Sequence, residues 1–167
     1  MAFGSTEATP AALERLYRSR FPVFLKVAAS VAGERHAADA VHNGFVRAFR
    51  YRAGFREGAS LEAWVWRTVI NAAHDLRHAD RDELVDWLPE GTGNGHAPSE
   101  RDEVRAVLSG LPPKQRLTVF LRYYADLDYE AIAEILDVSP GTVGATLHKA
   151  HAAIRERLRE DTRCAIR

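Results

Sequence analysis

Cysteine is almost absent from this chain of 167 residues, because Cys164 is the only one. A single cysteine excludes an internal disulfide and any cysteine-cluster site for zinc or iron–sulfur. Long uncharged apolar runs are also missing, and residues 1–20 show no basic segment followed by an apolar stretch. No membrane span or signal peptide is therefore predicted, and we expect a cytoplasmic protein without membrane insertion.

Sequence patterns of catalysis and cofactor binding are missing as well. There is no glycine-rich phosphate loop and no serine or cysteine nucleophile motif. His74 and His78 are spaced like a two-histidine metal pair, but neither a third ligand nor a metalloprotease motif accompanies them. We expect no enzymatic activity, no catalytic residues, no cofactor and no metal.

A net charge is lacking too, because 23 Lys and Arg balance 23 Asp and Glu. The charges are nevertheless unevenly distributed: residues 1–80 carry +3, residues 81–103 carry −5 and residues 104–167 carry +2. Two mildly basic blocks with an acidic connector indicate a domain architecture and leave DNA binding open.

An all-α fold is predicted, because apolar residues recur at helical steps of three and four and no strand alternation is visible. Residues 1–80 should form a bundle of three or four helices. Gly33 is expected to end a helix over 21–32, and Ser60 to cap a later helix. Two apolar stripes are predicted to face the core: Val41, Phe45 and Phe49, and then Val65, Val69, Ala72 and Leu76.

Residues 81–101 are predicted to be a flexible acidic linker between two small helical domains, 1–80 and 102–160, with 161–167 as a tail. The stretch 81–99 contains two prolines and three glycines, which prevent a continuous regular element. Its large apolar residues either pack against a domain or enter a partner's groove; they are Leu84, Val85, Trp87 and Leu88.

The second block should contain helices over 102–109, 114–124 and 129–136, and a last helix that Ser139 caps and Pro140 begins. Two helices joined by a tight Asp137-Val138 turn are typical of a helix-turn-helix, although a hairpin that binds nothing has the same pattern. Ala133 would allow a close helix crossing and Val138 would fill the turn. The inward stripe of the last helix is Val143, Leu147, Ala150, Ile154 and Leu158.

The segment LSGLPPKQRLTVFLRYYADLDYEAIAEILDVSPGTVGATLHKAHAAIRERL resembles the promoter-binding domain of RNA polymerase sigma factors of the extracytoplasmic-function group, in the sigma-70 family. The segments ADAVHNGFVRAFR and FREGASLEAWVWRTVINAAHDLR are similar to that family's N-terminal domain, in which one helix docks on polymerase and the next melts promoter DNA. The resemblance implies a sigma factor that binds core RNA polymerase and directs promoter-specific, DNA-templated transcription initiation. Its implied partners are core polymerase, promoter DNA and a candidate anti-sigma factor.

The resemblance also implies three sets of contact residues. Those for polymerase are Asp39, His42, Asn43 and Arg47. Those for the minus-ten promoter element are Phe55, Arg56, Ser60, Arg67, Asn71 and His74. Those for the minus-thirty-five element are Thr142, Ala145, Thr146, His148, Lys149 and Arg155.

The chain departs from the family pattern just after GTV, where the family carries lysine and arginine and this chain has Gly144, Ala145 and Thr146. Fewer basic side chains are available there to contact DNA phosphates, so we expect weaker binding to the upstream promoter element. Two alternatives therefore remain: a free-standing helix-turn-helix regulator, and a degenerate sigma-like protein that acts through a protein partner.

Overall fold

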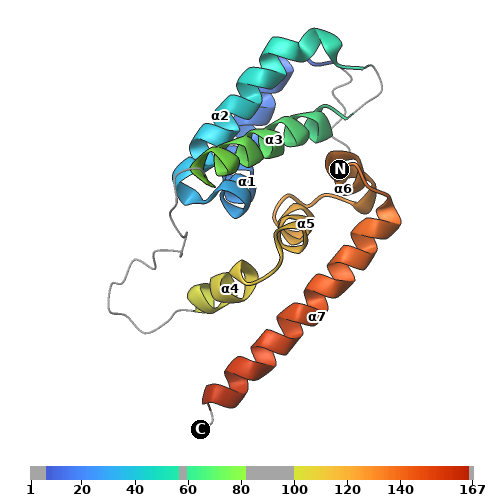
Figure 1. The fold of residues 1–167 in the computed structure, drawn as a ribbon. Coiled ribbons are helices and arrows are strands. Elements are labelled where there is room, and N and C mark those ends of the chain that lie inside the picture. Colours follow the sequence, from blue (N-terminus) through green and yellow to red (C-terminus); the bar gives the residue numbers. More distant parts are fainter. Residues whose placement is uncertain (1–6, 57–59, 82–99, 166–167) are drawn as a thin grey trace.

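The computed structural model describes residues 7–56, 60–81 and 100–165, which form seven α-helices and one 3-10 turn without any strand. Helices α1 (Pro10–Ala32), α2 (Glu34–Tyr51) and α3 (Leu61–Arg81) come first, and the 3-10 turn η1 (Arg52–Gly54) follows α2. Helices α4 (Glu100–Ser109), α5 (Pro113–Tyr123), α6 (Tyr129–Leu136) and α7 (Pro140–Ala165) come next (Figure 1). The predicted all-α fold is confirmed. Most of the predicted linker, including Leu84, Val85, Trp87 and Leu88, lies outside the described residues.

Side-chain caps fix where several helices begin. The hydroxyl of Ser60 accepts a hydrogen bond of 3.2 Å from the backbone N–H of Ala63 at the start of α3, as predicted. The carboxylate of Asp128 accepts one of 2.8 Å from the N–H of Ala131 at the start of α6. Gly33, with a φ of 85°, separates α1 from α2, because this backbone conformation has no steric penalty for glycine.

Helices α1, α2 and α3 form an N-terminal unit around aromatic and branched side chains. The rings of Phe24 and Trp66, both fully buried, lie with their centroids 3.9 Å apart. Gly44 lies where α2 crosses α3, and a Cβ built there would be only 2.6 Å from the Cα of Val69. The missing side chain at Gly44 therefore permits the close approach of the two helices.

Helices α4 to α7 form a C-terminal unit in which the long α7 packs against α5 and α6. Its largest fully buried side chains include Leu121 of α5, Ile132 of α6 and Leu147 of α7. Ala133 is buried as predicted, in keeping with a close crossing of α6 and α7. The capped α7 and the short α6 form the predicted helix-turn-helix.

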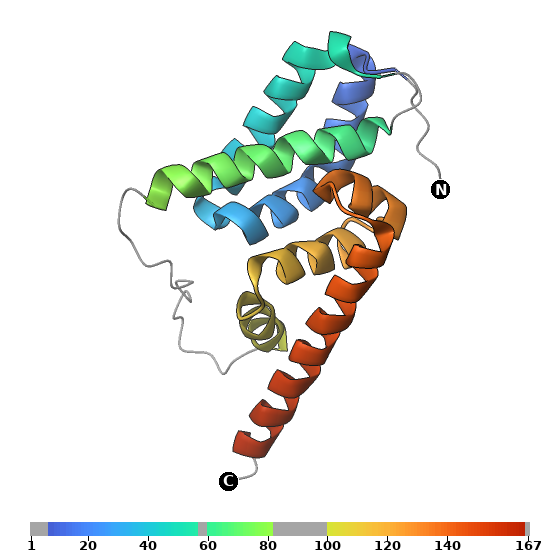
Figure 2. The same ribbon diagram turned by 45° about the vertical axis from the view of Figure 1, so that its right-hand side comes forward.

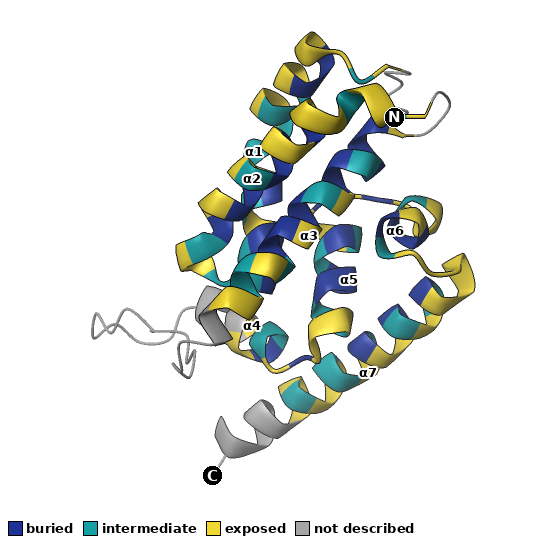
Figure 3. Ribbon diagram, turned by 45° about the horizontal axis from the view of Figure 1, so that its top comes forward, coloured by how far each residue is buried: buried dark blue, intermediate teal, exposed yellow. Residues whose placement is uncertain are grey.

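The two units pack against one another through α5 on α1 and α6 on α3. Figure 2 shows α5 and α6 on the side of the N-terminal unit formed by α1 and α3. Buried residues lie on both sides of this contact (Figure 3), and the buried hydrophobic residues of both units belong to one cluster. The two helical units are therefore held in one compact arrangement.

Three residues predicted to face the core are exposed instead. Phe49 is 48% exposed, because the last turns of α2 border an open groove instead of a third helix. Val138 is 39% exposed, because backbone hydrogen bonds to the carbonyl of Ala133 close the turn without a side-chain plug. Leu158 is 47% exposed, because the far end of α7 extends beyond α5 and α6 (Figure 1).

Candidate functional site

The residues predicted to contact polymerase form an outward row along α2. Asp39, His42 and Arg47 are exposed and Asn43 is half-buried. Arg47 Nη1 donates to a carboxylate oxygen of Asp75 on α3 at 2.7 Å, with both side chains largely in solvent. The row is therefore accessible along its length, and one member is tied to the neighbouring helix.

An apolar groove adjoins this row. Its exposed apolar residues, Val46 and Phe49, were not predicted from the sequence to be a contact surface. Phe49 and Val46 are about half exposed, and the guanidinium carbon of Arg52 lies 4.4 Å from the centroid of the Phe49 ring. The groove runs between the start of α1 and the end of α2, and it is lined by Pro10, Leu13, Glu14, Tyr17, His42, Phe45, Val46, Phe49, Arg50 and Arg52. A docking surface and a core face have the same helical period, so periodicity could not separate them.

The residues predicted to contact the minus-ten element lie on α3 and just before it. Arg56, Ser60, Arg67 and Asn71 are exposed, and the Ser60 hydroxyl already serves as the helix cap. The half-buried ring of Phe55 lies 5.4 Å from that of Trp64. The loop residues 57–59 between them lie outside the described part of the chain.

His74 is the half-buried member of this set. Burial lowers its pKa below the ordinary value for histidine, and the neighbouring charges of Arg77 and His78 lower it further. Asp75 acts in the opposite direction and does not outweigh them. His74 is therefore neutral at neutral pH, and its imidazole has one donor and one acceptor nitrogen for hydrogen bonding.

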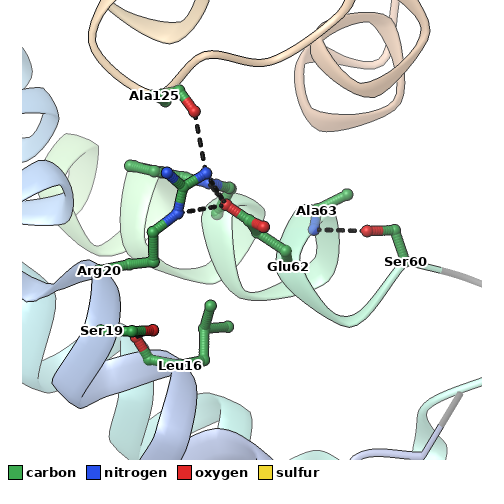
Figure 4. Close-up of polar contacts among 8 residues, drawn as sticks. Leu16, Ser19, Arg20, Ser60, Glu62, Ala63 and Ala125 are labelled. Carbon is green, nitrogen blue, oxygen red and sulfur yellow. Dashed lines mark hydrogen bonds and ion pairs between the residues drawn. The ribbon is translucent and has the colours of Figure 1, made fainter. Parts of the chain in front are cut away.

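An ion pair at the contact between the two units joins three segments (Figure 4). Arg20 of α1 donates from Nε and Nη2 to one oxygen of Glu62 in α3, at 3.0 and 2.6 Å. Trp66 Nε1 donates to the same oxygen at 3.3 Å. Arg20 Nη2 also donates to the backbone carbonyl of Ala125, just after α5, at 2.9 Å. One partly buried guanidinium therefore holds α1, α3 and the C-terminal unit together.

Two further arginines cross the same contact, and each donates to a backbone carbonyl. Arg116 of α5 reaches the carbonyl of Ser30 at 3.1 Å, and burial, with the charge of Arg77, lowers its pKa. Arg67 of α3 donates to the carbonyl of Glu134 on α6. Because Arg67 is a predicted minus-ten contact, the helix-turn-helix unit occupies part of the surface expected to meet DNA.

The helix-turn-helix presents one face of α7 to solvent. Ser139 caps α7 by accepting a hydrogen bond of 3.2 Å from the N–H of Thr142, as predicted. Among the predicted minus-thirty-five residues, Thr146 is half-buried and its hydroxyl donates to the carbonyl of Thr142 at 2.8 Å. The exposed members of this set are Thr142, Ala145, His148, Lys149 and Arg155.

No group of three metal-binding side chains is found among the described residues, and His74 and His78 gain no third ligand from that part of the chain. None of the helices described is both long and apolar enough to span a membrane.

Comparison with known proteins assigns the fold and the two units. Family models match residues 16–82 as Sigma-70 region 2 and residues 101–154 as Sigma-70, region 4. The RNA polymerase sigma-E factor of Streptomyces avermitilis is 31% identical, over 73% of this chain and 70% of that protein. The ECF RNA polymerase sigma factor SigE of Mycolicibacterium smegmatis is 27% identical, over 94% of this chain and 65% of that protein.

Two solved structures share the fold. The sigma factor RpoE of Bartonella quintana, in complex with the anti-sigma factor NepR, matches with a TM-score of 0.73 and 20% identity, over 87% of this chain and 96% of that one. CnrH, in complex with the cytosolic domain of CnrY, matches with a TM-score of 0.70 and 22% identity, over 92% and 91%. The region 2 and region 4 matches and the relatives above agree on one family, and the chain belongs to the extracytoplasmic-function group of sigma-70 RNA polymerase sigma factors.

Proposed function

We propose that the two units divide the work of promoter recognition. The N-terminal unit docks on core RNA polymerase through α2 and traps the minus-ten element on α3, while α7 of the C-terminal unit reads the minus-thirty-five element. The observation that carries this proposal is the presence of two separate outward surfaces, on α2–α3 and on α7, in one chain. Because the two sites are on one chain, binding of one raises the effective concentration of the other at its target. Neither site therefore needs a strong positive charge.

Polymerase docking is proposed for Asp39, His42, Asn43 and Arg47. The groove beside them adds Phe49, an aromatic ring with a half-open face next to two arginines. Aromatic anchors in partly formed pockets contribute most of the binding energy at protein interfaces. The half-exposed ring of Phe49 in this groove supports its role in docking.

Minus-ten recognition is proposed for Phe55, Arg56, Ser60, Arg67, Asn71 and His74. Flipping one base out of the duplex costs a few kcal/mol, which aromatic and polar contacts to that base must offset. Arg67 donates to the carbonyl of Glu134, and in this proposal α6 moves away from α3 when DNA loads at this surface. The compact arrangement is then a resting state and the DNA-bound arrangement is open.

A protein inhibitor is proposed as a third partner. RpoE of Bartonella quintana is held by the anti-sigma factor NepR, and that chain shares its fold with 87% of this one. A compact state in which Arg67 donates to α6 gives such an inhibitor a conformation to stabilise. We place this function in the bacterial cytoplasm, where polymerase acts, and propose no enzymatic activity for the chain itself.

In vitro transcription with core polymerase, with and without this protein, tests the proposal. Promoter-specific transcripts that depend on the protein are expected. Binding to duplex DNA as a dimer without any binding to polymerase would indicate a free-standing regulator. Binding to an inhibitor protein without transcripts would indicate a degenerate sigma-like protein.

A further inference from the structure

The exposed face at the start of α7 consists mainly of carbon. Val143, Leu147 and Ala150 are 1%, 2% and 0% exposed, which fixes the side of the helix that faces the core. The opposite side of the first two turns exposes Thr142 and Ala145. These are the residues that a recognition helix places nearest the base edges, because its N-terminal turns enter the major groove.

Side chains suited to reading three of the four bases are missing from this part of α7. Guanine is read mainly by arginine or lysine, adenine by asparagine or glutamine, and cytosine by aspartate or glutamate. Residues 139–147 contain none of these six residue types. No long hydrogen-bonding side chain in the first two turns can therefore read a base. The first long polar side chains along α7 are those of His148 and Lys149.

The hydroxyl groups in these turns are engaged within the helix. Ser139 Oγ and Thr142 Oγ1 share a hydrogen bond of 2.9 Å, and Ser139 Oγ also caps the helix. Thr146 donates its hydroxyl to a carbonyl of its own helix. The remaining surface that Thr142 and Ala145 offer to DNA is dominated by methyl groups.

Gly144 adds no side chain to this surface. It is half-buried, and a Cβ built there would lie 3.5 Å from a ring carbon of Tyr129 on α6. The position faces α6, and an added Cβ would be in ordinary van der Waals contact with the tyrosine ring. Ala145 is therefore the nearest exposed Cβ after Thr142.

We propose that α7 reads its promoter element through the C5-methyl groups of thymine, which pack against the methyl groups of Ala145 and Thr142. Apolar contact by alanine or threonine is the readout available for thymine in the major groove. His148 and Lys149, further along the same face, then contact phosphates and set the register. The inference rests on the proposed entry of α7 into the minus-thirty-five element and names the base that it recognises there.

The test uses the full chain bound to core polymerase. Promoter DNA with a randomised upstream element is selected for binding and transcription, and the enriched element is then resynthesised with deoxyuridine in place of single thymines. Deoxyuridine preserves base pairing and removes only the methyl group. We expect an A·T-rich element and a loss of about fourfold in affinity at each contacted thymine, which corresponds to burial of one methyl group.

Two alanine variants on the same helix assign the contact. In Ala145→Gly the difference between thymine and deoxyuridine should shrink at one position of the element, because the protein methyl group is gone. Ala152→Gly is the matched control, since Ala152 is also exposed on α7 and its replacement carries the same helical cost of about 1 kcal/mol. The control should keep the full difference at every position.

The outcomes separate this inference from the proposed function. Transcripts from an enriched G·C-rich element, or from an A·T-rich element that tolerates deoxyuridine everywhere, would overturn the thymine readout and leave the sigma function standing. Equal loss of the deoxyuridine effect in both alanine variants would also overturn it. A complete lack of protein-dependent transcripts would refute the proposed function itself.

Discussion

Arg20 and Glu62 form a nearly buried ion pair between α1 and the first turn of α3, with side chains only 22% and 10% exposed. The carboxylate also accepts from Trp66, and the guanidinium also reaches the carbonyl of Ala125. These extra hydrogen bonds offset part of the cost of removing both charges from water. The pair therefore contributes both to the N-terminal core and to the contact between units.

Replacing Arg20 with alanine is expected to lower the free energy of unfolding by about 3 kcal/mol, because it leaves the Glu62 carboxylate buried without its charge partner. Urea unfolding followed by circular dichroism measures the loss. Arg18→Ala is the matched control, since its ion pair with Glu14 is exposed and contributes at most about 0.5 kcal/mol. Equal losses in the two variants would contradict the structural role of Arg20.

Gly44→Ala is expected to destabilise the protein, although alanine favours a helix over glycine by about 1 kcal/mol. The added Cβ would lie 2.6 Å from the backbone Cα of Val69, and a backbone atom cannot move aside as a flexible side chain can. We expect a net loss of about 1 to 3 kcal/mol in urea unfolding, as for other overpacked positions. Gly54→Ala is the control, because nothing lies within 4 Å of its added Cβ. Stabilisation by Gly44→Ala would show that α2 and α3 approach less closely.

Most of the architecture could be predicted because it depends on local signals. Ser60 and Ser139 cap helices where capping residues were expected, and Gly33 ends α1 at the predicted position. Gly44 shows the opposite case, since its close approach to Val69 joins two helices and no local pattern in the sequence indicates it. The helical period likewise places Phe49 on an apolar stripe, but it does not show that the end of α2 borders an open groove.

The contact between the two units could not be predicted from the sequence either. Arg20, Arg67 and Arg116 each donate to a backbone carbonyl of the other unit. Every residue has such a carbonyl, so no pattern of complementary charges in the sequence indicates these pairings. The resemblance placed Arg67 on a DNA surface without showing that it donates to a carbonyl of α6.

The stability of the N-terminal unit should depend on the charge of His74. Burial lowers its pKa in the folded state, whereas the unfolded chain has a value of about 6.5. Protons then bind more readily to the unfolded state, so the free energy of unfolding should fall as the pH drops below about 7. Urea unfolding in steps from about pH 8 to pH 5.5 measures this slope, and His74→Gln should reduce it. His42→Gln, an exposed position on α2, should keep it; the same slope in all three proteins would argue against His74.

Phe49→Ala should weaken binding to core polymerase by at least about tenfold, the usual loss for an aromatic anchor. The ring is 48% exposed, so the unfolding free energy should change little. Affinity is measured by fluorescence titration of labelled protein with core polymerase. Tyr51→Ala, which removes a ring that is 63% exposed and does not line the groove, should bind normally. If Phe49→Ala binds as tightly as the control, docking does not use the groove.

Linking the two units covalently should prevent transcription while preserving the fold. Lys26 of α1 lies with its Nζ 4.8 Å from the ring centroid of Tyr124, just after α5, and neither belongs to a proposed contact surface. In a Cys164→Ser background, Lys26→Cys and Tyr124→Cys are joined by a short bis-maleimide, which holds the C-terminal unit, with α6, against the N-terminal unit. The unlinked double variant and each single-cysteine variant treated with the reagent should support transcription, and the linked protein should not. Full transcription from the linked protein would show that the compact arrangement already admits promoter DNA, because opening is the only step that the link removes.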